Sequence, residues 1–116
     1  VEVESLVSYT SEQAKRGKKH YEKYCAECHG KEFKGGVNGG PVLRGVKFLE
    51  TYANGAPASW LYEFMYYMMP PDQAGRFSRK KYADMMAYIM KKNGFKAGGE
   101  PLPSDIDALE NLIMDK

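Results

Sequence analysis

The stretch Cys25-Ala26-Glu27-Cys28-His29 decides how the rest of this sequence is interpreted. It has the form C-x-x-C-H, which is typical of covalent haem attachment. Two thiols separated by two residues at the end of a helix can reach the two vinyl positions on one edge of a porphyrin. The next residue then passes beneath the ring, so that His29 can present its imidazole to the iron. The motif therefore predicts a haem bonded through Cys25 and Cys28, with His29 as an axial ligand.

Two other uses of a Cys-x-x-Cys pair agree less well with the sequence. A thioredoxin-like redox site needs a βαβ setting, and the sequence shows none. A zinc site would need two ligands besides Cys25 and Cys28, and the only histidines are His20 and His29. Because Cys28 and His29 are adjacent, they would strain a tetrahedral site. Haem attachment is the favoured interpretation.

The sixth position of the iron is predicted to be filled by Met69. Methionine opposite histidine is typical of electron-transfer haems with a raised potential. Met69 precedes Pro70-Pro71, and a residue before proline disfavours the α conformation, so the thioether can be presented from an extended loop. Met68 is the nearest rival, Met65 and His20 are weaker candidates, and an iron with an open sixth site is a further alternative.

Apolar residues recur at helical spacing along most of the chain, and no run alternates for long enough to suggest a sheet. We therefore predict an all-α fold in a single domain over 1–116. Its core should cover about 10–96, with a loose lead-in at 1–9 and an acidic tail at 97–116. The predicted helices, with the residue expected to cap each start, are 10–24 (Thr10, with Gln13 reaching back), 46–53, 57–69 (Ser59), 78–92 (Ser78) and 104–113 (Ser104).

The composition fits one small domain around a cofactor. The chain has 116 residues, of which 43% are hydrophobic, with nine Tyr, five Phe, one Trp and seven Met. Such side chains suit a core that grips something flat and polarizable. Two cysteines are too few for a disulfide framework, and no apolar run reaches the roughly 18 residues of a membrane span.

Charge is spread unevenly along the chain. Residues 10–48 hold nine Lys/Arg against four Glu, residues 79–96 hold six against one Asp, and residues 97–116 hold five acids and one Lys. The balance is too small, and no aromatic-basic motif accompanies it, for nucleic-acid binding. The two basic segments are either an ordinary solvated surface or a docking face for an acidic partner.

Over residues 10–96 the chain resembles the class I c-type cytochromes. Gly40, Pro41 and Leu43 follow His29 by eleven, twelve and fourteen residues, which matches the haem-cradling loop of that family. The resemblance implies a cytochrome c fold in which the Pro41 carbonyl accepts a hydrogen bond from His29, fixing the tautomer of the imidazole. It also implies that the first and last helices cross where a glycine meets aromatic rings. The residues that fit this crossing are Gly17, Tyr21 and Tyr88.

From Met69 onward the sequence is also similar to cytochromes that accompany pyrroloquinoline-quinone dehydrogenases. The similar stretches are Met69-Pro70-Pro71, Ser78, Tyr82, 87–89, 93–95 and 97–98. This closer likeness implies a quinoprotein dehydrogenase as electron donor, with an oxidase or another haem protein as acceptor.

The combined prediction is a monohaem c-type cytochrome that transfers single electrons between redox proteins and is not an enzyme. We expect it to be exported to a bacterial periplasm, with its signal peptide already removed. The alternatives are a catalytic or ligand-sensing haem with a labile sixth site, and an electron-transfer subunit of a larger dehydrogenase complex. Besides Cys25, Cys28, His29 and Met69, the residues expected to line the haem c pocket are Pro41, Val42, Leu43, Phe48, Trp60, Phe64 and Tyr82.

Overall fold

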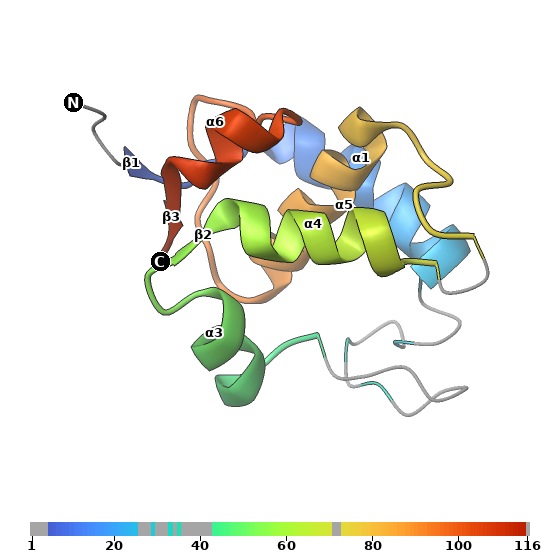
Figure 1. The fold of residues 1–116 in the computed structure, drawn as a ribbon, viewed down its shortest axis with the longest axis horizontal. Helices are drawn as coiled ribbons and strands as arrows, with labels where there is room; N and C mark the ends of the chain where they lie inside the picture. Colours follow the sequence, from blue (N-terminus) through green and yellow to red (C-terminus); the bar gives the residue numbers. More distant parts are fainter. Residues whose placement is uncertain are drawn as a thin grey trace.

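The computed structural model describes residues 5–25, 29, 33, 35, 43–70 and 73–115. Within these ranges the chain is mainly helical, as predicted (Figure 1). The helices are α1 (Ser11–His20), η1 (Tyr21–Cys25, a π-helical continuation of α1), α3 (Val46–Tyr52), α4 (Ala58–Met68), α5 (Arg79–Lys92) and α6 (Ile106–Glu110). No helix in this part of the chain is long and apolar enough to cross a membrane.

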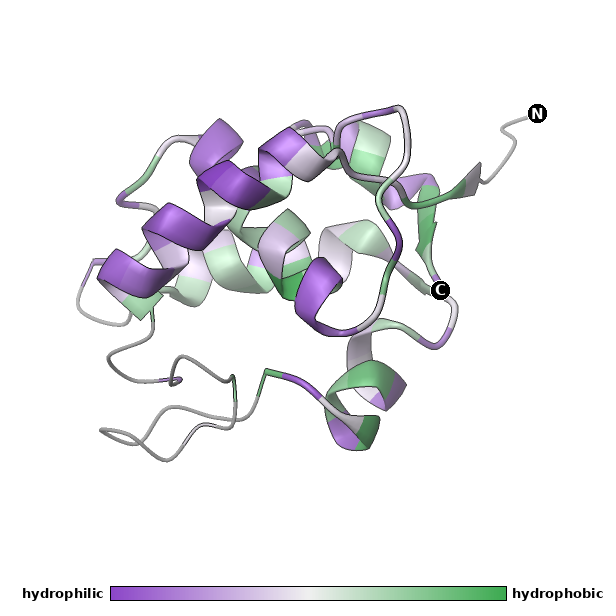
Figure 2. Cartoon of the chain, turned by 180° about the vertical axis from the view of Figure 1, so that it is seen from behind, coloured by the Kyte–Doolittle hydropathy of each residue, from purple (hydrophilic) through white to green (hydrophobic). Residues whose placement is uncertain are grey.

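Helices α1 and α5 cross closely at Gly17, as expected from the sequence. A β-carbon added at Gly17 would lie 1.8 Å from the backbone oxygen of Asp84. One turn further along, the rings of Tyr21 and Tyr88 are 5.7 Å apart. The predicted crossing is therefore confirmed, but Gly17 meets the backbone of α5, and the aromatic rings meet each other one turn away. Figure 2 shows the molecule from behind, and the helices nearest the viewer are mostly hydrophilic on the side that faces outward.

The helix starts agree with the sequence in two cases. The Gln13 backbone N–H donates to Thr10 Oγ1 at 3.2 Å, and the Lys81 N–H donates to Ser78 Oγ at 3.2 Å. The side chain of Gln13, however, bonds the distant backbone of Leu102, where it donates from Nε2 at 2.9 Å and accepts at Oε1 at 2.7 Å. The prediction that the Gln13 side chain reaches back to the helix start is therefore wrong, and this side chain instead fixes the C-terminal segment to α1.

The other two predicted caps are wrong. Helix α4 begins at Ala58 after Pro57, and Ser59 is buried inside its first turn. The cap of α6 is Asp105, whose carboxylate accepts from the Ala108 N–H at 3.4 Å, and α6 ends at Glu110. In both cases a neighbouring residue was able to take the extended backbone that a cap requires.

A small sheet forms where the sequence predicted none. Its strands are β1 (Ser5–Leu6), β2 (Ala56–Pro57) and β3 (Leu112–Met114), in the order β1-β3-β2. Strand β3 runs parallel to β1 and antiparallel to β2. Strands of two or three residues are too short to show an alternating pattern, so the period of two could not identify them.

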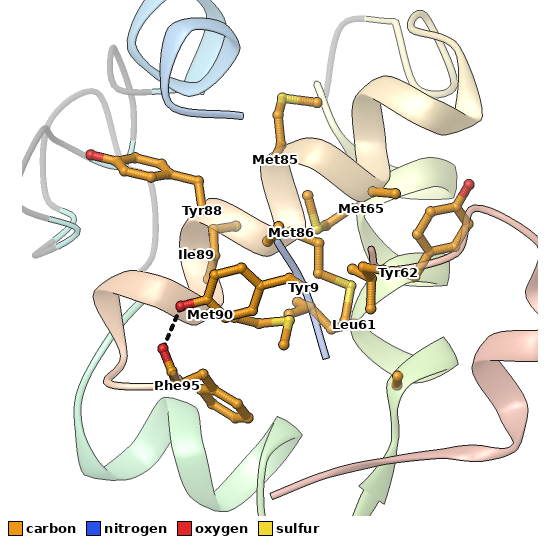
Figure 3. Packing of buried hydrophobic residues seen from close by; sticks show 14 of the residues in the cluster. Tyr9, Leu61, Tyr62, Met65, Met85, Met86, Tyr88, Ile89, Met90 and Phe95 are labelled. Carbon is orange, nitrogen blue, oxygen red and sulfur yellow. Dashed lines mark hydrogen bonds between the residues drawn. The ribbon is translucent and has the colours of Figure 1, made fainter. Parts of the chain in front are cut away.

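The described part of the lead-in, residues 5–9, is held to the rest of the fold and is not loose. Tyr9 is 2% exposed, and its hydroxyl donates to the Phe95 carbonyl (Figure 3). Every residue of α5 from Tyr82 to Met90 is buried, so α5 is the central helix of the fold. Figure 3 shows its side chains Met86 and Met90 among Leu61, Met65 and Tyr9. Helix α5 therefore fixes the positions of both α1 and α4.

Candidate haem site

A mainly apolar cavity of about 280 Å³ lies between η1, α3, α4 and α5. That volume is slightly below the range of about 300–1,000 Å³ that is typical of ligand and cofactor sites. The described residues that line it are Tyr21, Cys25, His29, Leu43, Phe48, Tyr52, Leu61, Phe64, Met65, Met69 and Ile89.

The two proposed iron ligands reach this same cavity from separate segments of the chain. His29 is 7% exposed, and its backbone oxygen accepts from the Gly35 N–H at 2.8 Å. Met69 follows α4 directly and has an extended backbone, with φ −122° and ψ 140°. This is the conformation expected for a residue before proline. Met68, the nearest rival, is 54% exposed and does not line the cavity.

The backbone of Met69 is held by hydrogen bonds at both of its polar groups. Its N–H donates to the Met65 carbonyl at 3.0 Å. Its carbonyl accepts from the Tyr82 hydroxyl at 2.6 Å. The loop that carries the thioether is therefore attached to both α4 and α5.

Of the two cysteines predicted to attach the haem, only Cys25 lies within the described residues. It ends η1, lines the cavity, and its Sγ is 3.8 Å from Met85 Sδ. Cys28, Pro41 and Val42 lie outside the described residues, so their predicted roles stay predictions.

The remaining pocket predictions divide into three groups. Leu43, Phe48 and Phe64 line the cavity as expected. Tyr82 does not line it but contacts the backbone of Met69. Trp60 is 58% exposed and does not line it. The reason is the orientation of α4, which buries Leu61 and Met65 and leaves Trp60 on its solvent side.

Buried Asn93 is a supporting residue that the sequence indicated only as a helix end. Its Nδ2 donates to the carbonyls of Leu43 and Ile89, each at 2.9 Å. Its Oδ1 accepts from the Gly45 N–H at 3.2 Å. Asn93 thus attaches the segment before α3 to the end of α5, which places Leu43 in the cavity wall. The side-chain hydrogen bonds of asparagine at turns are the signal that could have indicated this role.

The residues present fit a haem. An imidazole, a thiol and the thioethers of Met65 and Met69 meet in one apolar cavity, and all three group types are known ligands or attachment groups for haem. Burial raises the pKa of Tyr21 in the cavity wall, and Cys25 and Tyr88 add to that rise, so its hydroxyl stays protonated. His20 does not line the cavity. Elsewhere in the described ranges, no group of three or more His, Cys, Asp or Glu side chains could hold a metal.

Comparison with known proteins supports this interpretation. A family model described as "Cytochrome C oxidase, cbb3-type, subunit III" matches residues 12–89. Searches of curated proteins and of solved structures found no match. The matched residues include the C-x-x-C-H motif, every cavity-lining residue named above and most of the α1–α5 crossing. Because this match covers more than half of the chain, the protein belongs to the c-type cytochrome family described as cytochrome c oxidase, cbb3-type, subunit III, whose domains bind haem for electron transfer.

Proposed function

We propose that this chain is a single-electron carrier with one haem c, attached through Cys25 and Cys28 and ligated by His29 and Met69. The observation that carries the proposal is that His29 and Met69 line one apolar cavity with Cys25 in its wall. When bound, the haem supplies a one-electron iron couple. Two protein ligands leave no iron position for a substrate, which favours electron transfer over catalysis.

The role of the chain's own residues is to hold the ligands and to exclude water. Leu43, Phe48 and Leu61 make the cavity wall apolar, and a dry surrounding is one of the factors that set a haem potential. The hydrogen bonds of the Met69 backbone limit how far this residue can move. Small movement between the two oxidation states is what a carrier needs.

The partners and the location are also proposals. The likeness of the chain from Met69 onward to cytochromes of quinoprotein dehydrogenases supports such an enzyme as donor. The description of the matched family supports an oxidase as acceptor. Attachment through two free thiols supports assembly outside the cytoplasm, in the periplasm of a bacterium.

The test is to express the chain with a c-type maturation system and to purify the holoprotein. Haem that stays with the polypeptide in a denaturing gel would support covalent attachment, and Cys25→Ala and Cys28→Ala should each weaken it. An optical redox titration should follow a one-electron curve. The oxidised protein should also show the weak charge-transfer band, at the red end of the visible spectrum, that marks a methionine–iron bond. A high-spin spectrum without that band would instead support the catalytic or ligand-sensing alternative.

A further inference from the structure

The Tyr82 hydroxyl lies at the junction of the loop that follows α4 and the start of α5. Tyr82 is 1% exposed, and its hydroxyl donates to the Met69 carbonyl at 2.6 Å. It stands four residues after Ser78, the residue that caps α5. The capped first turn of α5 therefore fixes the position of the hydroxyl that holds Met69.

The ring of Tyr82 is held on two sides. Its centroid is 5.3 Å from that of Tyr66 on α4, in an edge-to-face arrangement. On the other side it is 5.7 Å from Phe77, which precedes α5. Aromatic pairs at these separations add stabilisation beyond burial, so the hydroxyl has little freedom to leave the Met69 carbonyl.

We infer that Tyr82 is a positioning residue for the Met69 ligand: its hydroxyl holds the Met69 backbone in the place from which the thioether reaches the cavity. This inference rests on the proposed function. It assigns the strength of the Met69–iron bond partly to a residue that does not line the cavity.

The test compares Tyr82→Phe with Tyr62→Phe in the holoprotein. Tyr62 is a matched control because it is fully buried and its hydroxyl can donate to the carbonyl of either Ser104, at 3.0 Å, or Arg79, at 3.2 Å. Both variants lose one hydroxyl from a buried tyrosine, but only Tyr82→Phe removes the bond to Met69. The probe is imidazole, which competes with Met69 for the oxidised iron and displaces the methionine–iron band.

We expect Tyr82→Phe to bind imidazole about five- to tenfold more tightly than the parent protein, the effect of losing one hydrogen bond. Its midpoint potential should also fall, whereas Tyr62→Phe should match the parent in both measurements. If the two variants bind imidazole equally tightly while the parent shows the methionine–iron band, the positioning role of Tyr82 is wrong but Met69 ligation stands. Absence of the band in the parent would overturn the proposed Met69 ligation and this inference with it.

Discussion

Gly17 on α1 lies so close to Asp84 on α5 that any side chain at position 17 would overlap the Asp84 carbonyl oxygen. The obstructing atom belongs to the backbone, so the overlap could be relieved only by moving the helices apart. Helix α5 supplies Ile89 to the cavity and Tyr82 to the Met69 loop. The crossing at Gly17 therefore helps to fix where Ile89 lies at the haem cavity and where Tyr82 meets the Met69 loop.

Gly17→Ala should destabilise the protein. Alanine favours a helix over glycine by roughly 1 kcal/mol, but overpacking of a tight contact costs about 1–3 kcal/mol. We therefore expect the packing cost to be the larger effect and the free energy of unfolding to fall. Urea unfolding of the holoprotein measures the change. Gly99→Ala is the control, because no atom lies within 4 Å of its added carbon. A Gly17→Ala protein as stable as the parent would show that the helices separate at little cost.

Removal of Arg16 should leave a buried carboxylate without its cation. Asp84 has a side chain that is 3% exposed, and it accepts from Arg16 Nε at 3.0 Å and from Nη2 at 3.3 Å. The Arg16 side chain is 47% exposed, and solvent screening therefore weakens the ion pair. We expect Arg16→Ala to lower the free energy of unfolding by about 1–3 kcal/mol. Lys15→Ala, at an exposed neighbouring position, should change it little, and equal losses would count against the ion pair.

His20 should make the fold less stable in mild acid. Burial lowers its pKa, Lys81 and Lys23 add to that effect, and Asp84 opposes it. Because the folded pKa lies below the unfolded value of about 6.5, the unfolded chain binds more protons as pH falls below that value, and stability decreases. His20→Gln should therefore lose less stability than the parent between about pH 7.5 and pH 5.5. Parallel curves for the two proteins would show that His20 is not responsible.

The choice between two adjacent methionines is tested by replacing each. Met69→Ala should remove the methionine–iron band and lower the midpoint potential, because Met69 lines the cavity. Met68→Ala should keep both properties, because Met68 is exposed. Optical spectra and redox titrations of the two holoproteins decide the question, and the reversed pattern would assign the ligand to Met68.

Electron transfer to an anionic reagent should depend on salt. Helices α1 and α5 lie together and carry most of the lysines and arginines of the two basic segments. Oxidation by hexacyanoferrate(III) should slow as ionic strength rises from about 0.01 to 0.1 M, because the Debye length falls from about 30 to 10 Å. A cationic acceptor is the control and should show the opposite trend. A flat rate with both reagents would mean that these charges serve solubility alone.

The helices and part of the cavity wall were predictable because their signals are local. Capping by Thr10 and Ser78 and the proline after Met69 each restrict the backbone within a few residues. The lining residues Tyr21, Tyr52, Leu61 and Ile89 were not predicted, because their place depends on how the helices pack. The placement of Trp60 was not predictable, because it depends on which face α4 turns towards α5. The bonds of Asn93 to Leu43 and of Gln13 to Leu102 were also not predictable, since they join residues far apart in the chain.

The sheet bears on what counts as a complete folding unit of this cytochrome. Residues 5–7 and 112–114 both lie outside the stretch that matches the family, yet the Val7 N–H donates to the Ile113 carbonyl at 2.9 Å. Leu102, Leu109 and Met114 are each no more than 3% exposed. A fragment trimmed to residues 12–89 would lose these side chains from its interior, together with the Leu102 partner of Gln13. We therefore expect the smallest cooperative unit to be larger than the segment that identifies the family. The hydrogen-bonded amides of Val7 and Leu102 should exchange with solvent as slowly as those of the helices they cover.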